Sequence, residues 1–383
     1  MTDVTAKLTK KLGFGCMRFP KLGEEEIDKK TLCGMFDRFL EEGFIYFDTA
    51  HGYHGGKSEE AVRECLTSRH PRESYLLADK LTDSFFSKEE EIVPLFESQL
   101  KACGVEYFDN YLIHTVTAHN YGKYSDCHAF EICSRLKEEG KIRHLGFSFH
   151  DNADFLEKVL TEHPEVEFVQ LQFNYADYND ESVQSRRCYE TCRRFGKPVI
   201  VMEPVRGGSL ADPPESAKKV FDAFNSAHGR TDSYASYAIR YAASFENVML
   251  VLSGMSTPEQ VEDNLAHMKD FRPLDGEEKK LIEDVVAAMA GDDEIRCTAC
   301  GYCLAGCPKN IPIPAIFSAI NSGKRFGGWS HGYYYRISVA GKGKASDCIG
   351  CGKCEKTCPQ HLEIRKHLAA AAELYDKKHE KEE

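Results

Sequence analysis

Short apolar runs alternate with amphipathic segments from about residue 11 to residue 268. Each run has six or seven residues rich in Val, Ile, Leu, Phe and Tyr, which is typical of buried β-strands. The eight runs cover residues 12–17, 44–49, 75–80, 108–114, 144–149, 168–174, 198–204 and 248–253. The pattern predicts eight strands.

The segments between these runs have the periodicity of helices. In segment 87–102, Ile92, Phe96 and Leu100 share one face, and acidic side chains such as Glu90 lie on the other. Four segments are followed by a glycine, the residue that favours a left-handed helix end, at Gly43, Gly104, Gly140 and Gly196. The predicted helices cover residues 28–41, 58–67, 88–102, 127–139, 153–161, 181–195, 233–244 and 258–269.

Eight strand–helix units in about 260 residues match the count and size of an α/β (β/α)8 TIM barrel. A doubly wound open sheet usually needs fewer units, and its dinucleotide-binding form carries G-x-G-x-x-G after the first strand. The triplet Gly13-Phe14-Gly15 begins that motif without completing it. We therefore expect a barrel over residues 1–274, a linking helix over 275–291 and a second unit over 292–383.

Composition supports a folded chain without a membrane span. Of 383 residues, 42% are hydrophobic and 29% charged, the balance of a globular protein. No apolar run approaches the ~18 residues that cross a bilayer, and the first thirty residues lack a signal-peptide pattern. We expect a cytoplasmic protein whose 16 cysteines are thiols or metal ligands rather than disulfides.

Four chemically active side chains follow three neighbouring predicted strands. Asp48 ends the second strand with Tyr53 in the loop beyond, Lys80 ends the third and His114 ends the fourth. In a barrel these ends meet on one rim, where the active sites of this fold lie. A Lys ammonium lowers the pKa of a nearby tyrosine, a carboxylate keeps the Lys charged, and a histidine can orient a carbonyl oxygen. The set suits proton donation to a carbonyl that receives hydride.

The motifs around these residues resemble those of the aldo-keto reductases. The similar positions are Phe47-Asp48-Thr49-Ala50, Tyr53, Gly56, Ser58, Glu59, Lys80, 109–114, Gly146-Phe147-Ser148 and 170–174. The resemblance covers about residues 11–270. It implies NAD(P)H-linked reduction of a small-molecule carbonyl, with Tyr53 as general acid supported by Asp48, Lys80 and His114.

The same resemblance implies a nicotinamide coenzyme site. Ser148 and Gln170 would hold the carboxamide, and the last strand and helix would hold the adenosine phosphate. The implied coenzyme residues are Ser148, Gln170, Asn174, Gly254, Met255, Ser256, Gln260 and Asn264. The chain departs from the common pattern at Phe149 and at Met202, which replaces a tyrosine stacked on the nicotinamide. Gly254 and Gln260 replace a Lys and an Arg for the 2′-phosphate, which leaves NAD and NADP both open.

Eight cysteines form a duplicated metal-binding pattern. The spacing C-x2-C-x2-C-x3-C-P occurs at residues 297–308 and again at 348–359. In two-cluster ferredoxins the fourth cysteine of each run ligates the other cluster. Zinc is the alternative, but structural zinc sites do not need the third C-x2-C step. We expect two [4Fe–4S] clusters, one on Cys297, Cys300, Cys303 and Cys358, the other on Cys348, Cys351, Cys354 and Cys307.

This second unit resembles two-cluster ferredoxin domains, and the order of the two units resembles a class of aldo-keto reductase fusions. A helical pattern at 314–321 in the 40-residue spacer suggests a helical dicluster domain. The other eight cysteines are expected to be buried thiols. Cys16 can face the substrate, and Cys188 with Cys192, one helical turn apart, has metal binding as its alternative.

Charge is distributed unevenly. The net charge is −12, but residues 292–383 hold 14 basic and 11 acidic residues, +3, which leaves −15 on residues 1–291. The stretch 308–346 has no acid and contains Trp329 and three consecutive tyrosines. Such a segment can bind single-stranded nucleic acid, dock an acidic protein or lie over an acidic neighbour. We expect no nucleic-acid partner.

A nicotinamide passes two electrons as hydride, whereas each cluster passes one. Direct coupling normally needs a flavin, which the sequence does not exclude. The first interpretation is an NAD(P)H-linked carbonyl reductase whose clusters exchange electrons with a ferredoxin or flavoprotein. The alternatives are a cluster-driven single-electron reductase without stable nicotinamide binding, and a non-enzymatic electron carrier with a barrel docking body.

Overall fold

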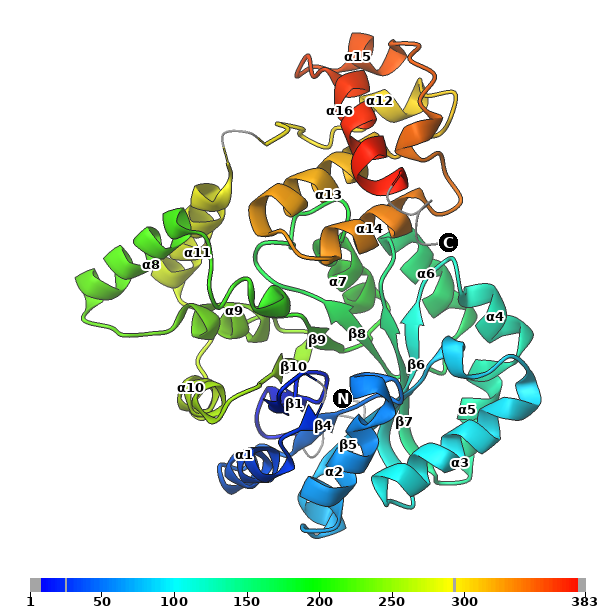
Figure 1. The fold of residues 1–383 in the computed structure, drawn as a ribbon, viewed down its shortest axis with the longest axis vertical. Helices are drawn as coiled ribbons and strands as arrows, with labels where there is room; N and C mark the ends of the chain where they lie inside the picture. The colour runs from blue at the N-terminus through cyan, green and yellow to red at the C-terminus, as the bar shows by residue number, and fades with distance from the viewer. Residues whose placement is uncertain (1–7, 25, 292–293, 378–383) are drawn as a thin grey trace.

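Eight parallel strands close into a barrel in the computed structural model, which describes residues 8–24, 26–291 and 294–377 (Figure 1). Around the barrel the strand order is β1-β10-β9-β8-β7-β6-β5-β4, and β1 pairs in parallel with both β10 and β4. The strands are β1 (Leu12–Gly15), β4 (Tyr46–Asp48), β5 (Leu76–Leu81), β6 (Phe108–Val116), β7 (Ile142–Phe149), β8 (Phe168–Gln172), β9 (Val199–Met202) and β10 (Val248–Gly254). The predicted (β/α)8 fold is confirmed.

Helices surround the barrel. Each predicted helical segment contains one, although residues 63–67 continue α2 as a π-helical turn. Helices α4 and α8 were not predicted. The helices are α1 (Lys29–Glu41), α2 (Ser58–Val62), α3 (Ile92–Cys103), α4 (Tyr121–Asp126), α5 (Ala129–Glu138), α6 (Ala153–Glu162), α7 (Ser185–Arg194), α8 (Glu215–His228), α9 (Tyr234–Ala243) and α10 (Pro258–Met268). A short hairpin of β2 (Lys21–Leu22) and β3 (Glu26–Ile27) follows β1.

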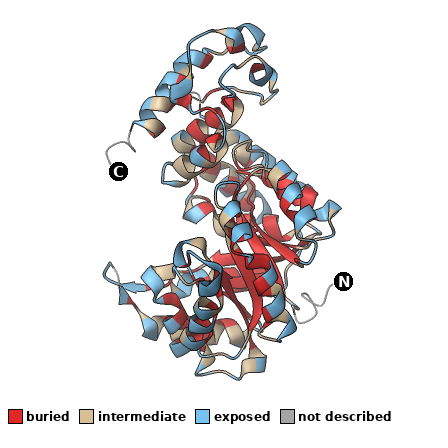
Figure 2. Cartoon of the chain, turned by 90° about the vertical axis from the view of Figure 1, so that its right-hand side faces the viewer, coloured by how far each residue is buried: buried red, intermediate tan, exposed pale blue. Residues whose placement is uncertain are grey.

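Two apolar layers hold the barrel together. One fills its interior, with members such as Leu76, Leu112, Phe168 and Leu250, and the other lies between strands and helices. Figure 2 shows the resulting pattern, in which the strands are buried and the helices expose their outer faces. The amphipathic periodicity of the sequence accounts for this arrangement, because each helix buries one stripe against the sheet.

The predicted linking helix packs against the barrel body. Helix α11 (Gly276–Met289) begins with a capping box between Asp275 and Glu278 and buries Leu281, Ile282 and Val285 beside α8. Glu278 also forms ion pairs with Arg230 and Arg240. The proposed boundary at 291/292 adjoins residues 292–293, which lie outside the described residues, so the division into units stays a prediction.

All regular elements described after residue 294 are helices, in agreement with the helical dicluster prediction. Helices α13 and α14 lie between the barrel and the tip formed by α12, α15 and α16 (Figure 1). A separate apolar cluster forms the core of this region. The helices are α12 (Tyr302–Ala305), α13 (Ile313–Phe326), α14 (Ser330–Val339), α15 (Lys353–Thr357) and α16 (Ile364–Ala371). In the described parts of the chain, no helix is long and apolar enough to cross a membrane.

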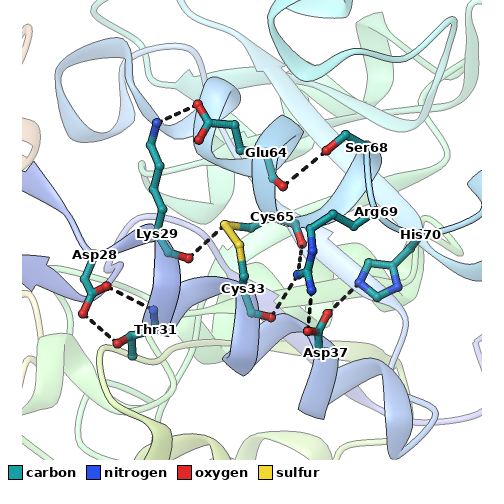
Figure 3. The surroundings of a disulfide bond; sticks show 10 residues. All are labelled: Asp28, Lys29, Thr31, Cys33, Asp37, Glu64, Cys65, Ser68, Arg69 and His70. Carbon is teal, nitrogen blue, oxygen red and sulfur yellow. Dashed lines mark hydrogen bonds and ion pairs between the residues drawn. A yellow bond between two sulfur atoms is a disulfide. The ribbon is translucent and has the colours of Figure 1, made fainter.

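The expectation that no cysteines pair was wrong at one place. Cys33 on α1 and Cys65 on the turn after α2 form a disulfide, with Cα atoms 4.5 Å apart (Figure 3). The helices that carry them pack side by side, a proximity between segments that composition does not reveal. Six others are buried free thiols as expected: Cys16, Cys103, Cys127, Cys133, Cys188 and Cys192.

Candidate active site and cluster sites

A buried ion pair lies at the carboxyl end of two adjacent strands. Lys80 on β5 donates from Nζ to Asp48 Oδ1 on β4 at 2.5 Å and to the Thr49 carbonyl at 2.6 Å. Lys80 is fully buried and Asp48 is 3% exposed. Burying two ionisable groups is costly unless they are paired and hydrogen-bonded, and here each has the other as its partner.

Tyr53 and His114 complete the predicted group of four. Lys80 Nζ lies 4.9 Å from the centre of the Tyr53 ring, and the Tyr53 and His114 rings are 6.0 Å apart in an edge-to-face arrangement. Asp48, Tyr53 and His114 line a cavity of about 530 Å³ at this end of the barrel, and Cys16 also lines it. The structure therefore brings the four predicted side chains together, with Asp48, Tyr53 and His114 at the cavity wall and Lys80 buried against Asp48 and the Tyr53 ring.

The electrostatics of Tyr53 differ from the sequence expectation. Burial raises the pKa of Tyr53 above 10.0, and the positive charge of Lys80 opposes this without overcoming it. Burial also acts to lower the pKa of Lys80, but the Asp48 carboxylate raises it above its ordinary value. Tyr53 is thus a protonated donor at neutral pH, beside a permanent cation.

His114 is held as a neutral ring. Burial, together with the charge of Lys80, lowers the pKa of His114 well below 6.5. Its Nδ1 lies 2.6 Å from the Thr82 hydroxyl, which leaves Nε2 for another partner. A neutral imidazole can donate a hydrogen bond to a carbonyl oxygen without adding charge.

The predicted carboxamide residues lie next to this group. Gln170 lines the cavity and donates from Nε2 to Asp48 Oδ2 at 3.1 Å. The Ser148 hydroxyl accepts from the Thr115 amide at 2.6 Å. Asn174 lies elsewhere, because its side chain bonds to Asp177 at 2.9 Å and to the Glu203 carbonyl at 3.1 Å, within the loop after β8.

The residues predicted to bind the adenosine phosphate lie in different surroundings. Gly254 lines the cavity, whereas Met255 is buried in the core. Ser256 lies at the start of α10, with its amide 2.7 Å from Gln260 Oε1. Asn264 bonds to Ser253 Oγ at 2.8 Å and so fixes the preceding strand. Gly254, Ser256 and Gln260 are the members of this segment that an adenosine phosphate could reach.

Several cavity residues were not predicted. They either follow strand ends or come from the C-terminal region, where the acid-free aromatic stretch was the available signal. Residues 326–334 of that stretch contribute to the cavity lining beside barrel residues, as the interpretation of a segment lying over its neighbour predicts. The unpredicted lining residues include Arg18, His150, Gln172, Glu203, Arg206, Phe326, Gly327, Gly328, Trp329, Ser330, Tyr333 and Tyr334.

The eight patterned cysteines form two sets in the crossed arrangement predicted from their spacing. One hollow is lined by Cys297, Cys300, Cys303 and Cys358, and a second by Cys307, Cys348, Cys351 and Cys354. Ile313 lines both hollows, so they share a wall at the start of α13. Across the described ranges, no three His, Cys, Asp or Glu side chains gather closely enough to hold a single metal ion.

Each hollow has the donors that an iron–sulfur cluster needs. Four thiols face each one, and apolar side chains such as Phe317 and Leu368 close its inner wall. Four cysteine thiolates are the usual ligands of a [4Fe–4S] cluster. Cys300 and Cys351 are exposed, so both hollows reach the protein surface. The residues present fit two such clusters.

Comparison with known families matches both regions. Residues 11–287 match the aldo/keto reductase family, and residues 296–363 match the 4Fe-4S dicluster domain. The L-galactose dehydrogenase of Arabidopsis thaliana is 25% identical over 264 residues, 64% of this chain and 80% of that protein. The NADH-specific methylglyoxal reductase of Escherichia coli is 26% identical over 263 residues, 58% of this chain and 78% of that protein.

Solved structures share the barrel fold. An aldo-keto reductase of Klebsiella pneumoniae in complex with NADPH has a TM-score of 0.57 at 19% identity, covering 72% of this chain and 90% of its own. The holo form of a Bacillus halodurans aldo-keto reductase has a TM-score of 0.59 at 24% identity, covering 74% and 94%.

Proposed function

The chain belongs to the aldo/keto reductase family, and we propose that it reduces a small-molecule carbonyl with NAD(P)H while two [4Fe–4S] clusters exchange electrons with a partner protein. The observation that carries the proposal is the buried Lys80–Asp48 pair beneath Tyr53, at the wall of the cavity. Nothing in a purely structural barrel requires a buried cation beside a tyrosine at its mouth.

In this proposal the chain's own residues donate the proton and stabilise the charge that remains. The nicotinamide, when bound, supplies hydride to the carbonyl carbon. Tyr53 donates its hydroxyl proton to the carbonyl oxygen, and the nearby Lys80 charge stabilises the phenolate that remains. Asp48 keeps Lys80 charged and in place. Neutral His114 orients the carbonyl oxygen through Nε2.

The coenzyme would lie along the cavity from Gln170 toward Gly254. Gln170 is fixed by Asp48, so it can present its amide to the carboxamide in one orientation. Beyond Gly254, a phosphate at the positive end of α10 would take the place of Gln260 Oε1 as the acceptor for the Ser256 amide. The Klebsiella structure with NADPH and the NADH-specific Escherichia coli relative support a nicotinamide coenzyme of either kind.

The clusters would serve electron exchange at the far tip of the molecule. Cys300 and Cys351 are exposed, and Tyr302 and Ile349, next to them, are 65% and 61% exposed. Apolar side chains beside a cluster edge suit brief contact with a ferredoxin or flavoprotein. When bound, the clusters supply or accept single electrons there.

The test is the change Tyr53→Phe in anaerobically purified holoprotein. We expect kcat/KM for NAD(P)H-dependent carbonyl reduction to fall about 10²-fold or more, because a general acid contributes that much. The matched control is Tyr234→Phe, which removes a tyrosine hydroxyl that donates to Asp222 outside the cavity and should leave activity unchanged. Full activity in Tyr53→Phe would overturn the proposal.

Met202 is the observation that favours a second candidate function. It lines the cavity where many family members place a tyrosine, which favours a cluster-driven single-electron reductase with weak nicotinamide binding. That function requires both clusters for turnover. Sustained turnover with NAD(P)H alone after Cys351→Ser, in protein whose circular dichroism is unchanged, would exclude it.

A further inference from the structure

The walls of the catalytic cavity come from both regions of the chain. Strand ends and the loops beyond them supply Asp48, Tyr53 and His114, while the turn between α13 and α14 supplies Trp329 and the first turn of α14 supplies Tyr333. This segment, residues 326–334, is called the roof below. Its remaining lining members are Phe326, Gly327, Gly328, Ser330 and Tyr334.

Buried contacts fix the roof to the barrel. Arg206, in the loop after β9, pairs with Asp177 at 2.9 Å and donates to the Ser322 hydroxyl of α13 at 2.5 Å. Its guanidinium also lies 4.1 Å from the centre of the Phe326 ring. Because Arg206 is 5% exposed, these contacts are shielded from water and hold α13 in one place.

A tight turn directs the roof toward the cavity. Gly327 and Gly328 have φ values of 61° and 73°, which non-glycine residues rarely adopt. The turn places Trp329 at the start of α14, so that Trp329 and Tyr333 occupy one turn of that helix. On the barrel side, His150 contacts the Tyr333 ring edge to face at 5.7 Å.

The roof is a connected set of aromatic rings. Trp329 and Tyr333 contact each other edge to face at 5.7 Å, and Tyr333 and Tyr334 do so at 5.3 Å. Trp329 nevertheless stays 65% exposed, and it lines the same cavity as Tyr53 and His114. A flat ring bound in this cavity would gain aromatic contacts with the roof and cover exposed apolar surface.

We propose that the roof is a specificity element and that the enzyme's substrates are carbonyl compounds bearing an aromatic ring. The inference rests on the proposed carbonyl reductase function and adds the substrate class. The ring lies against Trp329 and Tyr333, and the carbonyl oxygen reaches Tyr53 and His114. The dicluster region therefore completes the substrate site in addition to carrying clusters.

Two aldehydes of the same ring size test the substrate class. Benzaldehyde has a flat aromatic ring, and cyclohexanecarboxaldehyde has a saturated ring of the same six carbons. We expect the holoprotein to prefer benzaldehyde, and the double change Trp329→Ala with Tyr333→Ala to lower its kcat/KM about tenfold, through KM. For cyclohexanecarboxaldehyde, kcat/KM of the double variant should stay within about twofold of the wild-type value.

Tyr234→Ala is the matched control, because it removes a partly exposed aromatic ring on α9 that does not line the cavity. It should leave both aldehydes unaffected. Equal losses for the two aldehydes in the roof variant, or no loss for benzaldehyde, would overturn the inference while leaving carbonyl reduction intact.

Fluorescence separates this inference from the proposed function. Trp329 is the single tryptophan of the chain, so its emission reports on the roof alone. We expect saturable quenching by benzaldehyde in both wild type and Tyr53→Phe, and much weaker quenching by cyclohexanecarboxaldehyde. Quenching without turnover in wild type would reject the reductase function and keep the aromatic site. The aromatic site would be rejected if the two aldehydes quenched the Trp329 emission equally, or if neither quenched it.

Discussion

At the scale of single residues, Lys80 bears on both the stability of the barrel and the proposed proton transfer from Tyr53. Its ammonium is fully buried and bonds to Asp48 and the Thr49 carbonyl, so the fold must supply partners that water would otherwise provide. The same fixed charge lies 4.9 Å from the Tyr53 ring centre, where a phenolate would form. In the proposed function, one ion pair thus contributes both to the packing of the barrel rim and to the acidity of Tyr53.

Lys80→Met is expected to lower both the free energy of unfolding and kcat. Removing one partner leaves Asp48 buried without its cation, which costs about 3 kcal/mol of unfolding free energy. We also expect kcat to fall about 10²-fold or more, because the phenolate loses its stabilising charge. Denaturant unfolding and steady-state kinetics measure the two effects.

The control is Lys158→Met, which breaks the half-exposed Lys158–Glu162 pair on α6. An exposed pair contributes less than about 1 kcal/mol, so stability and kcat should hardly change. Similar effects of the two changes would contradict the assigned role of Lys80.

The pH dependence of reduction follows from Tyr53 and His114. The donor must be protonated, and because burial raises the pKa of Tyr53 above 10.0, its proton is lost only as pH rises beyond that value. His114 remains neutral because its pKa is held well below 6.5. We expect kcat/KM to be flat from about pH 6 to pH 9 and to fall above about pH 10. An inflection near pH 6.5 that disappears in His114→Asn would contradict this.

At the scale of elements, the sequence pattern predicted the strands because each buried run is short, apolar and bounded by helical periodicity. The end of each strand was placed to within about three residues, which was enough to put Asp48, Lys80 and His114 on one rim. Asn174 could not be placed in the same way, since it lies in a loop whose hydrogen bonds to Asp177 and Glu203 depend on tertiary structure.

Close strand packing gives a prediction at this scale. A Cβ on Gly146 of β7 would lie 2.6 Å from the Phe168 ring and 2.7 Å from the Phe168 carbonyl oxygen, which is backbone and cannot move aside easily. We expect Gly146→Ala to lower the free energy of unfolding by about 2 kcal/mol. Thermal or denaturant unfolding measures the change.

Gly34 provides the matched glycine. It lies exposed in α1, and a Cβ there meets nothing within 4 Å. Gly34→Ala should raise the free energy of unfolding by about 0.5–1 kcal/mol, because alanine favours helix. Equal effects at the two positions would show that close packing at β7 is not what requires glycine.

At the scale of the whole molecule, the crossed cysteine sets were predictable because the spacing of each run fixes which thiols can share a cluster. The Cys33–Cys65 disulfide was not, since its partners lie 32 positions apart on separate elements without a shared motif. The roof could be predicted from the sequence only in part. Its composition marked residues 308–346 as unusual, but only the folded chain identifies the surface that it covers.

Arg206 is expected to hold the two regions together. Arg206→Ala removes the ion pair to Asp177, the hydrogen bond to Ser322 and the contact with Phe326 at once. We expect a loss of about 3 kcal/mol in stability and faster hydrogen exchange in α13 and α14.

Arg187→Ala, which breaks an exposed pair with Asp154, is the control and should change stability by less than about 1 kcal/mol. Unchanged exchange in α13 and α14 after Arg206→Ala would mean that other contacts fix the roof.

The most direct measurement of the central claim is the origin of the hydrogen on the product carbon. Anaerobic holoprotein is mixed with benzaldehyde and NADPH that carries deuterium at the transferring C4 position, in ordinary water. Direct reduction at the Tyr53 site predicts deuterium on the alcohol carbon and a solvent-exchangeable proton on the oxygen. A product whose carbon-bound hydrogen comes from the solvent would contradict hydride transfer and favour electrons delivered singly from the clusters.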